Sequence, residues 1–94
     1  MSDTVYIKMD RSVEITHEKV TIGDIAKIES KNKNIVNNIK SIKILADKPE
    51  LGNRYVISIM RIIEIIDEKF QNVDISNIGE TDCIVEFKIL HVNH

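Results

Sequence analysis

Apolar residues recur with two different periods along this chain, and the contrast restricts the folds that it can adopt. Near the N-terminus, Val5, Ile7 and Met9 alternate with polar residues, as in a half-buried strand. Near the C-terminus, a second alternating set comprises Cys83, Val85, Phe87 and Ile89. In the middle, helical spacing connects Val56, Ile59, Met60, Ile63, Ile66 and Phe70. The sequence predicts an α+β fold with a small, mainly antiparallel sheet, one long helix and one or two short helices.

The long helix is predicted over residues 58–70, with Ser58 as its N-cap. Its apolar arc is wide, because Ile57, Ile62 and Ile65 flank the main stripe. Either the small core uses all of these positions, or a strip remains free for a partner. We expect Ile63 to be buried, so that Ile63→Asp would cost several kcal/mol.

The first thirty residues predict a hairpin followed by a short helix. Val13 and Ile15 continue the alternation after Asp10-Arg11, which favours a second strand paired with the first. Thr21 precedes Asp24 by three residues, the spacing of a capping box. One buried helical face would then hold Ile22, Ile25 and Ala26. Asp24 is accordingly interpreted as a cap rather than a functional carboxylate.

Shorter elements are predicted between and after these segments. A polar loop is expected over residues 29–33, then a helix capped by Asn34 that carries Ile35, Val36 and Ile39. Brief strands are expected around Ile42 and Ile44, and again around Val73 and Ile75. Turns are expected over residues 47–53, which hold the single proline, and over residues 79–82.

Length and charge indicate one small domain, residues 1–94, without a nucleic-acid footprint. A chain of 94 residues buries roughly 60–65% of the surface that its unfolded form exposes. The net charge is −2, and no basic stripe interleaved with aromatics occurs. One cysteine excludes an intramolecular disulfide. No signal peptide and no apolar stretch of about 20 residues is present, so a soluble chain is expected.

Candidate reactive residues are few, and each has a structural interpretation. Cys83 is in phase with core positions and has no neighbouring base, so it is expected to be a buried thiol. His17, His91 and His94 lack the spacing of metal ligands. The isolated glycines at 23, 52 and 79 form no phosphate-binding loop. We therefore expect no catalytic, cofactor-binding or metal-binding residues, no cofactor and no enzymatic activity.

Four segments carry a resemblance to a known family: Val5-Tyr6-Ile7-Lys8, Val20-Thr21-Ile22-Gly23-Asp24-Ile25-Ala26, Tyr55-Val56-Ile57, and Ile78-Gly79 through Ile84-Val85-Glu86. Their order and spacing, from about Thr4 to Phe87, resemble the N-terminal domain of stage V sporulation protein AA. The Ile, Lys and Asn bias would suit a clostridial member.

The resemblance implies a subunit of the stage V sporulation A membrane complex, which moves dipicolinic acid with calcium into the spore and releases it in germination. It also implies membrane spans after this domain. We thus expect a soluble accessory or docking domain of a protein of the inner forespore membrane, with the other subunits as partners.

The first thirty residues show a second, fainter similarity, to the β-clip modules of flagellar P-ring assembly chaperones. A strand, a turn and a Thr-x-x-Asp step occur in both, but His17-Glu18-Lys19 replaces the usual turn glycine. This similarity keeps open an alternative function, an assembly-chaperone-like module that binds protein and has no membrane anchor.

Overall fold

The computed structural model describes residues 2–17, 19–45 and 54–88. Its elements in chain order are β1 (Asp3–Met9), β2 (Ser12–Ile15), β3 (Val20–Thr21), α1 (Ile22–Ile25), β4 (Ala26–Glu29), α2 (Lys33–Lys40), β5 (Lys43–Leu45), β6 (Arg54–Ser58), α3 (Ile59–Lys69), β7 (Val73–Asn77) and β8 (Asp82–Phe87). The predicted α+β class, with one long and two short helices, is confirmed. The turn predicted over residues 47–53 lies outside the described residues, as do Ile89, His91 and His94.

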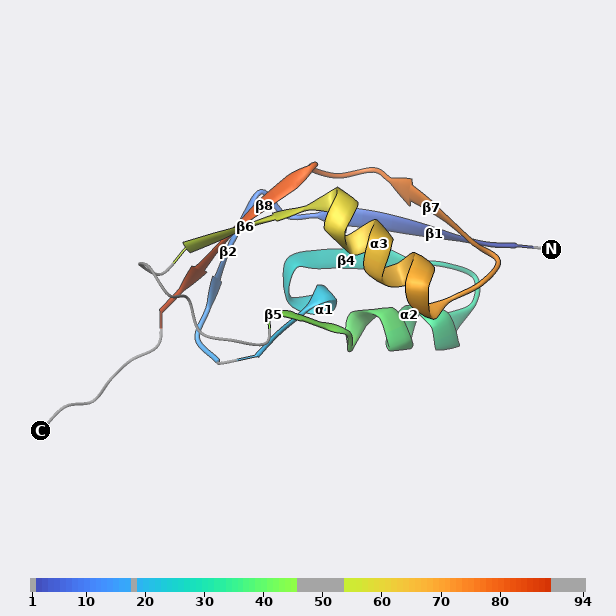
Figure 1. The fold of residues 1–94 in the computed structure, drawn as a ribbon, viewed down its shortest axis with the longest axis horizontal. Helices are drawn as coiled ribbons and strands as arrows, with labels where there is room; N and C mark the ends of the chain where they lie inside the picture. Colours follow the sequence, from blue (N-terminus) through green and yellow to red (C-terminus); the bar gives the residue numbers. More distant parts are fainter. Residues whose placement is uncertain (1, 18, 46–53, 89–94) are drawn as a thin grey trace, which may run out of the picture.

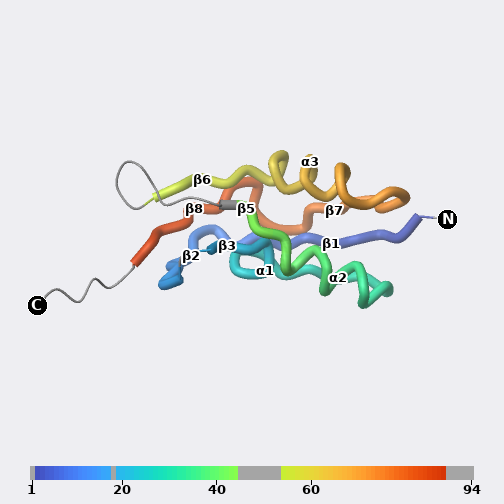
Figure 2. The backbone as a smooth tube through the Cα atoms, turned by 60° about the horizontal axis from the view of Figure 1, so that its bottom comes forward, coloured from blue at the N-terminus to red at the C-terminus, as the bar shows by residue number. Residues whose placement is uncertain are grey.

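The described strands form three small sheets, ordered β4-β1-β7, β2-β8-β6 and β3-β5. Three of the pairings are antiparallel, whereas β1–β7 and β2–β8 are parallel. Figure 1 shows sheet β2-β8-β6 at one end of the molecule and α2 and α3 toward the other. In Figure 2, α3 lies above β1 and β7, and α2 lies below them.

The predicted hairpin between the first two strands is wrong. β1 pairs with β4 and β7, and β2 leaves it to run parallel to β8. The backbone of Asp10 donates instead to the Ile25 carbonyl, at 2.8 Å, and Ile84 donates to the Arg11 carbonyl at 3.0 Å. The segment between β1 and β2 thus connects one sheet to the next. Alternating apolar residues occur on both sides of it, and this pattern does not distinguish such a connection from a hairpin.

The core follows the predicted strand periodicity. Val5, Ile7 and Met9 are buried on one face of β1, opposite Ile28 and Ala26 of β4 and Ile75 of β7. The polar alternates Thr4, Tyr6 and Lys8 face solvent. Cys83, Val85 and Phe87 are buried along β8, as predicted.

The segment from α1 to α2 differs from the predicted one in two places. Residues 26–29 form a strand, β4, which the sequence analysis divided between a helix and a loop. α2 begins two residues earlier than expected, because Asn32 and not Asn34 is the N-cap. The Asn32 Oδ1 accepts from the N–H groups of Asn34 and Ile35 at 3.1 and 3.3 Å. Val36 and Ile39 are buried and Ile35 is partly buried.

The long helix begins as predicted but presents a rotated face. Ser58 is the N-cap, and its Oγ accepts from the Met60 N–H at 3.1 Å. The buried residues of α3 are Ile59, Ile62, Ile65 and Ile66. Ile63, which was predicted to be buried, is only partly buried, and Met60 is 63% exposed. The buried face of α3 is therefore centred on Ile62 rather than on Ile63. Within the described residues, no helix has both the length and the hydropathy needed to cross a membrane.

Candidate interaction surface

Sheet β2-β8-β6 has one face in the core and one in solvent, which follows from strand alternation. The solvent-facing side chains, here called the outer face, are Ser12 and Glu14 of β2, Arg54 and Val56 of β6, and Ile84 and Glu86 of β8. On the opposite face the rings of Tyr55 and Phe87 meet edge to face, with centroids 6.1 Å apart. The inner face of this sheet is therefore packed against the core.

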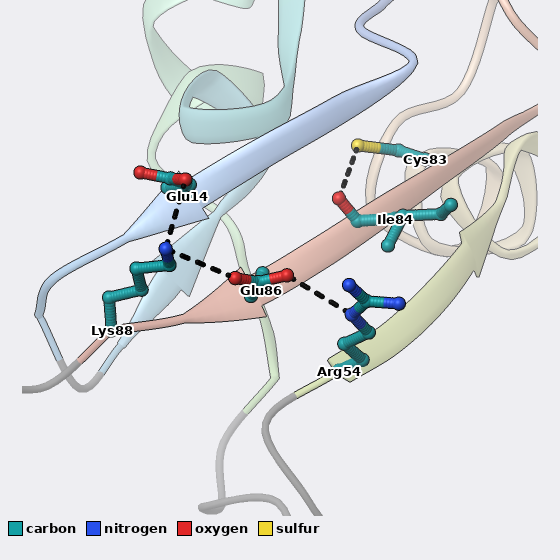
Figure 3. Close-up of polar contacts among 6 residues, drawn as sticks. All are labelled: Glu14, Arg54, Cys83, Ile84, Glu86 and Lys88. Carbon is teal, nitrogen blue, oxygen red and sulfur yellow. Dashed lines mark hydrogen bonds and ion pairs between the residues drawn. The ribbon is translucent and has the colours of Figure 1, made fainter.

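A row of charged residues crosses the outer face. Glu14 is in register with Glu86, and Glu86 with Arg54. Figure 3 shows the chain of contacts: Arg54 Nε lies 3.0 Å from Glu86 Oε2, while Lys88 Nζ lies 3.4 Å from both Glu86 Oε1 and Glu14 Oε1. The central carboxylate of Glu86 thus has a cation on either side.

This network shifts the ionisation of its members. The hydrogen bond from Arg54, followed by that from Lys88, lowers the pKa of Glu86. The hydrogen bond and charge of Glu14, followed by those of Glu86, raise the pKa of Lys88. Isolated exposed ion pairs contribute little to stability. The row is therefore a pattern of paired charges on the outer face and not a major source of stability.

An apolar pair lies beside the charged row. Val56 and Ile84 are in register on neighbouring strands and are 68% and 41% exposed. A shallow depression of about 270 Å³ lies next to them, lined by Ser12, Val13, Glu14, Arg54, Ile84 and Glu86. This volume is below that of most small-molecule sites. Exposed apolar side chains bordered by ordered charges are typical of a protein contact surface.

Cys83 lies on the core side of β8, as predicted, and not in this surface. Its Sγ contacts the Ile84 carbonyl oxygen at 3.8 Å (Figure 3). Burial, with a smaller contribution from the charge of Asp10, raises the pKa of the thiol to about 11. The thiol is therefore protonated at neutral pH, a state in which cysteine is a poor nucleophile.

The predicted capping interaction at Asp24 is present and includes a histidine that the sequence analysis left unpaired. Asp24 Oδ2 accepts from the Thr21 N–H at 2.9 Å and from its hydroxyl at 3.1 Å. His17 Nε2 lies 3.0 Å from the same oxygen. Burial acts to raise the pKa of Asp24, but the Thr21 and His17 hydrogen bonds outweigh it, and the pKa lies below its usual value. This arrangement caps α1 and ties the side chain of His17 to the start of that helix.

No group of three His, Cys, Asp or Glu side chains gathers at ligand distance in residues 2–17, 19–45 and 54–88. Among the three histidines, only His17 lies in this range. The expectations of no metal, no cofactor and no enzymatic activity stay predictions.

Comparison with known proteins decides the family. Residues 2–89 match a family model described as Stage V sporulation protein AA. The chain belongs to the stage V sporulation protein AA family. Its role is therefore in sporulation, and the resemblance stated from four segments is confirmed.

A solved structure has the same fold as this chain. A crystal structure titled as a functionally unknown protein from Eubacterium ventriosum ATCC 27560 is 61% identical, with a TM-score of 0.91. The match covers 96% of this chain and 98% of that one. No curated protein matches the chain.

The charged row of this stage V sporulation protein AA domain was missed by sequence reasoning. Glu14 and Glu86 each alternate with core residues, so their outward placement could have been predicted. Their juxtaposition could not, because it depends on the parallel pairing of strands that begin 70 residues apart, at Ser12 and Asp82. A local pattern does not specify which distant strands pair.

Proposed function

We propose that this chain is an accessory docking domain of the stage V sporulation A membrane complex, which moves dipicolinic acid with calcium during sporulation and germination. The outer face of sheet β2-β8-β6 carries the proposal, because it joins the exposed pair Val56 and Ile84 to a fixed row of charges. The other subunits of the complex are the proposed partners. The inner forespore membrane is the proposed location of the intact protein.

The domain is proposed to act through contact rather than through chemistry. The raised pKa and burial of Cys83 support this view, since a protonated core thiol is not available for attack. The net charge of −2 offers no electrostatic attraction for the dipicolinate dianion. We therefore propose that the domain binds protein subunits and does not itself hold dipicolinate.

The proposal is tested with one substitution in the intact protein, produced in a sporulating cell that lacks its own copy. Ile84→Lys would place a charge at the centre of the outer face while keeping β8 folded, because Ile84 is 41% exposed and lies between Asp82 and Glu86. We expect the dipicolinate content of the spores to fall several-fold and the protein to stop co-purifying with the other subunits. The amount of protein, measured by immunoblot, should not change.

Ile78→Lys is the matched control. Ile78 is also an exposed isoleucine, 58% accessible, but it lies between β7 and β8 and not on the outer face. It should leave dipicolinate content unaltered. Normal dipicolinate and normal co-purification in the Ile84→Lys strain would refute docking through this face.

A further inference from the structure

Within the described part of the chain, β6 is an edge strand, and no charged residue lies in its interior. Among the described residues its one strand neighbour is β8, and Figure 3 shows it at the border of the sheet. The other edge strands of the two larger sheets carry charges in their interior: Glu14 in β2, Lys27 in β4 and Asp74 in β7. Such charges discourage pairing between molecules. The interior of β6 is Tyr55, Val56 and Ile57, with its one charge, Arg54, at the first position.

The sequence of β6 is complementary to itself. If two copies pair antiparallel about Val56, then Arg54 lies opposite Ser58 of the second copy, Tyr55 opposite its Ile57, and Val56 opposite its Val56. A tyrosine facing a β-branched residue is a favourable cross-strand pair. Arg54 meets an uncharged serine, so no like charges face each other. We propose that β6 pairs antiparallel with β6 of a second copy, about a two-fold axis at Val56.

This pairing extends both faces of sheet β2-β8-β6. On the outer face, the register of Val56 with Ile84 produces one apolar row across the axis, Ile84 and Val56 of each copy. The neighbouring row runs from Glu86 through Arg54 to Ser58 and then Asp82 of the second copy, because Ser58 is in register with Asp82. The Arg54 guanidinium would therefore stand between two carboxylates. On the inner face, Tyr55 and Ile57 continue the apolar layer.

The contact is short, with five residues from each copy. Interfaces this small lie at the weak end of specific association, so the dimer should depend on concentration. A chain that is 61% identical, matched over 96% of this chain and 98% of its own length, has been crystallised. The isolated 94-residue chain is thus a suitable sample for the test.

Disulfide trapping tests the proposed register directly. Residues that face each other on antiparallel strands have Cα atoms about 4.5–5.5 Å apart, a separation that a disulfide spans. We expect mild oxidation to convert most of the Val56→Cys protein into a disulfide-linked dimer. On a gel run without reducing agent, this dimer should have twice the 10.8 kDa mass of the chain. Met60→Cys is the matched control, since Met60 is about equally exposed, at 63%, but lies outside β6. Met60→Cys should give no disulfide-linked dimer, and neither should the parent chain, whose single cysteine is buried.

A charge substitution at the axis provides the second measurement. Val56→Glu places two carboxylates opposite each other, whereas Val56→Thr keeps a β-branched strand former. In sedimentation at concentrations up to about 1 mM, the weak end of specific binding, the parent and Val56→Thr chains should form dimers. Val56→Glu should be monomeric with unchanged circular dichroism. A parent chain that stays monomeric throughout, together with no trapping at Val56→Cys, would overturn the proposal.

The two proposals fail separately. The docking proposal is tested by the dipicolinate content of spores of the Ile84→Lys strain. The self-pairing proposal is tested by the mass of the purified chain in solution. Consider a result in which Val56→Glu lowers the dipicolinate content of spores, the parent chain stays monomeric in sedimentation, and Val56→Cys forms no disulfide-linked dimer. In that case β6 would pair with a strand of another protein. That result would refute self-pairing and leave the docking proposal intact.

Discussion

Gly79 lies against the backbone of Met9: a Cβ at position 79 would stand 2.6 Å from the Met9 nitrogen and 2.8 Å from the Lys8 Cα. Backbone hydrogen bonds fix this approach on both sides, because Ile78 donates to the Ile7 carbonyl at 2.9 Å and Glu80 to the Met9 carbonyl at 3.3 Å. The glycine of the Ile78-Gly79 segment is therefore required by the packing of the β7–β8 connection on β1.

Gly79→Ala is expected to destabilise the domain by about 1–3 kcal/mol, the usual cost of forcing atoms into a well-packed site. The clash is with backbone atoms, which cannot rotate away as a side chain can. Urea denaturation followed by circular dichroism would measure the change in the free energy of unfolding.

Gly23→Ala is the matched control for this prediction. Its Cβ would lie 3.1 Å from the Lys40 carbonyl oxygen, a milder contact. Gly23 is also helical, where alanine is preferred over glycine by roughly 0.5–1 kcal/mol. We expect a much smaller effect than at position 79. Equal losses at the two glycines would contradict this assignment of the close contact.

The orientation of α3 leads to a second prediction. Ile62 is fully buried and Ile63 only partly so. Ile62→Ala should therefore cost about 2–5 kcal/mol, as for truncated core side chains, and Ile63→Ala clearly less. Both variants remove the same atoms from the same helix, so the difference in their urea midpoints reports burial alone. The reverse order would restore the Ile63-centred face expected from sequence.

Features that depend on residues two to four positions apart could be predicted from sequence. The alternation of Val5, Ile7 and Met9, the Thr21–Asp24 cap and the Ser58 N-cap are of this kind. The burial of Cys83 follows from the same alternation. These features depend only on the spacing of neighbouring residues, which can be read from the sequence.

Features that depend on distant pairing could not be predicted in this way. The partner of β2 is β8, far along the chain, and nothing in Val13 or Ile15 distinguishes it from the adjacent β1. β4 offers only two buried residues, Ala26 and Ile28, too few for a clear period. The buried face of α3 was predicted in the wrong place because five isoleucines and a methionine occupy most of the circumference of the helix. Because the β2–β8 pairing was not predicted, the charged row on the outer face could not be predicted either.

Asp24 leads to a prediction about pH. Its pKa in the folded chain is lowered from the usual 3.8. A carboxyl whose folded pKa lies below its unfolded value stabilises the fold above the unfolded pKa, and this contribution is lost as the pH falls through the folded value. Asp24→Asn should thus be less stable than the parent at pH 7. The difference in the free energy of unfolding between the two chains should become smaller as the pH falls below about 3.8.

The measurement is the free energy of unfolding of both chains at several pH values from neutral to acid. Glu64→Gln is a suitable control, because Glu64 is an exposed residue of α3 in a long 3.8 Å contact with Arg61. That variant should track the parent across the range. A gap for Asp24→Asn that stayed constant with pH would show that the charge of Asp24 does not stabilise the cap.

Cys83, the single cysteine of the chain, leads to a prediction about reactivity. With a pKa raised to about 11, its thiolate fraction at pH 7 is on the order of one part in ten thousand, and the thiolate is the form that reacts. The sulfur is also fully buried. A thiol reagent should therefore label the native chain very slowly and the urea-denatured chain rapidly. Fast labelling of the native chain at pH 7 would place the thiol at the surface and make a reactive Cys83 tenable.

The labelling rate of the native chain should also report how often the core opens. If Cys83 becomes accessible only when β8 separates from the core, the rate is proportional to the population of the open form. Ile62→Ala should then accelerate labelling by the factor that its loss of stability predicts, tenfold for each 1.4 kcal/mol. Ile63→Ala should accelerate it far less. Labelling that is equally slow in both variants would mean that β8 opens independently of α3, and that the two parts of the core are not cooperative.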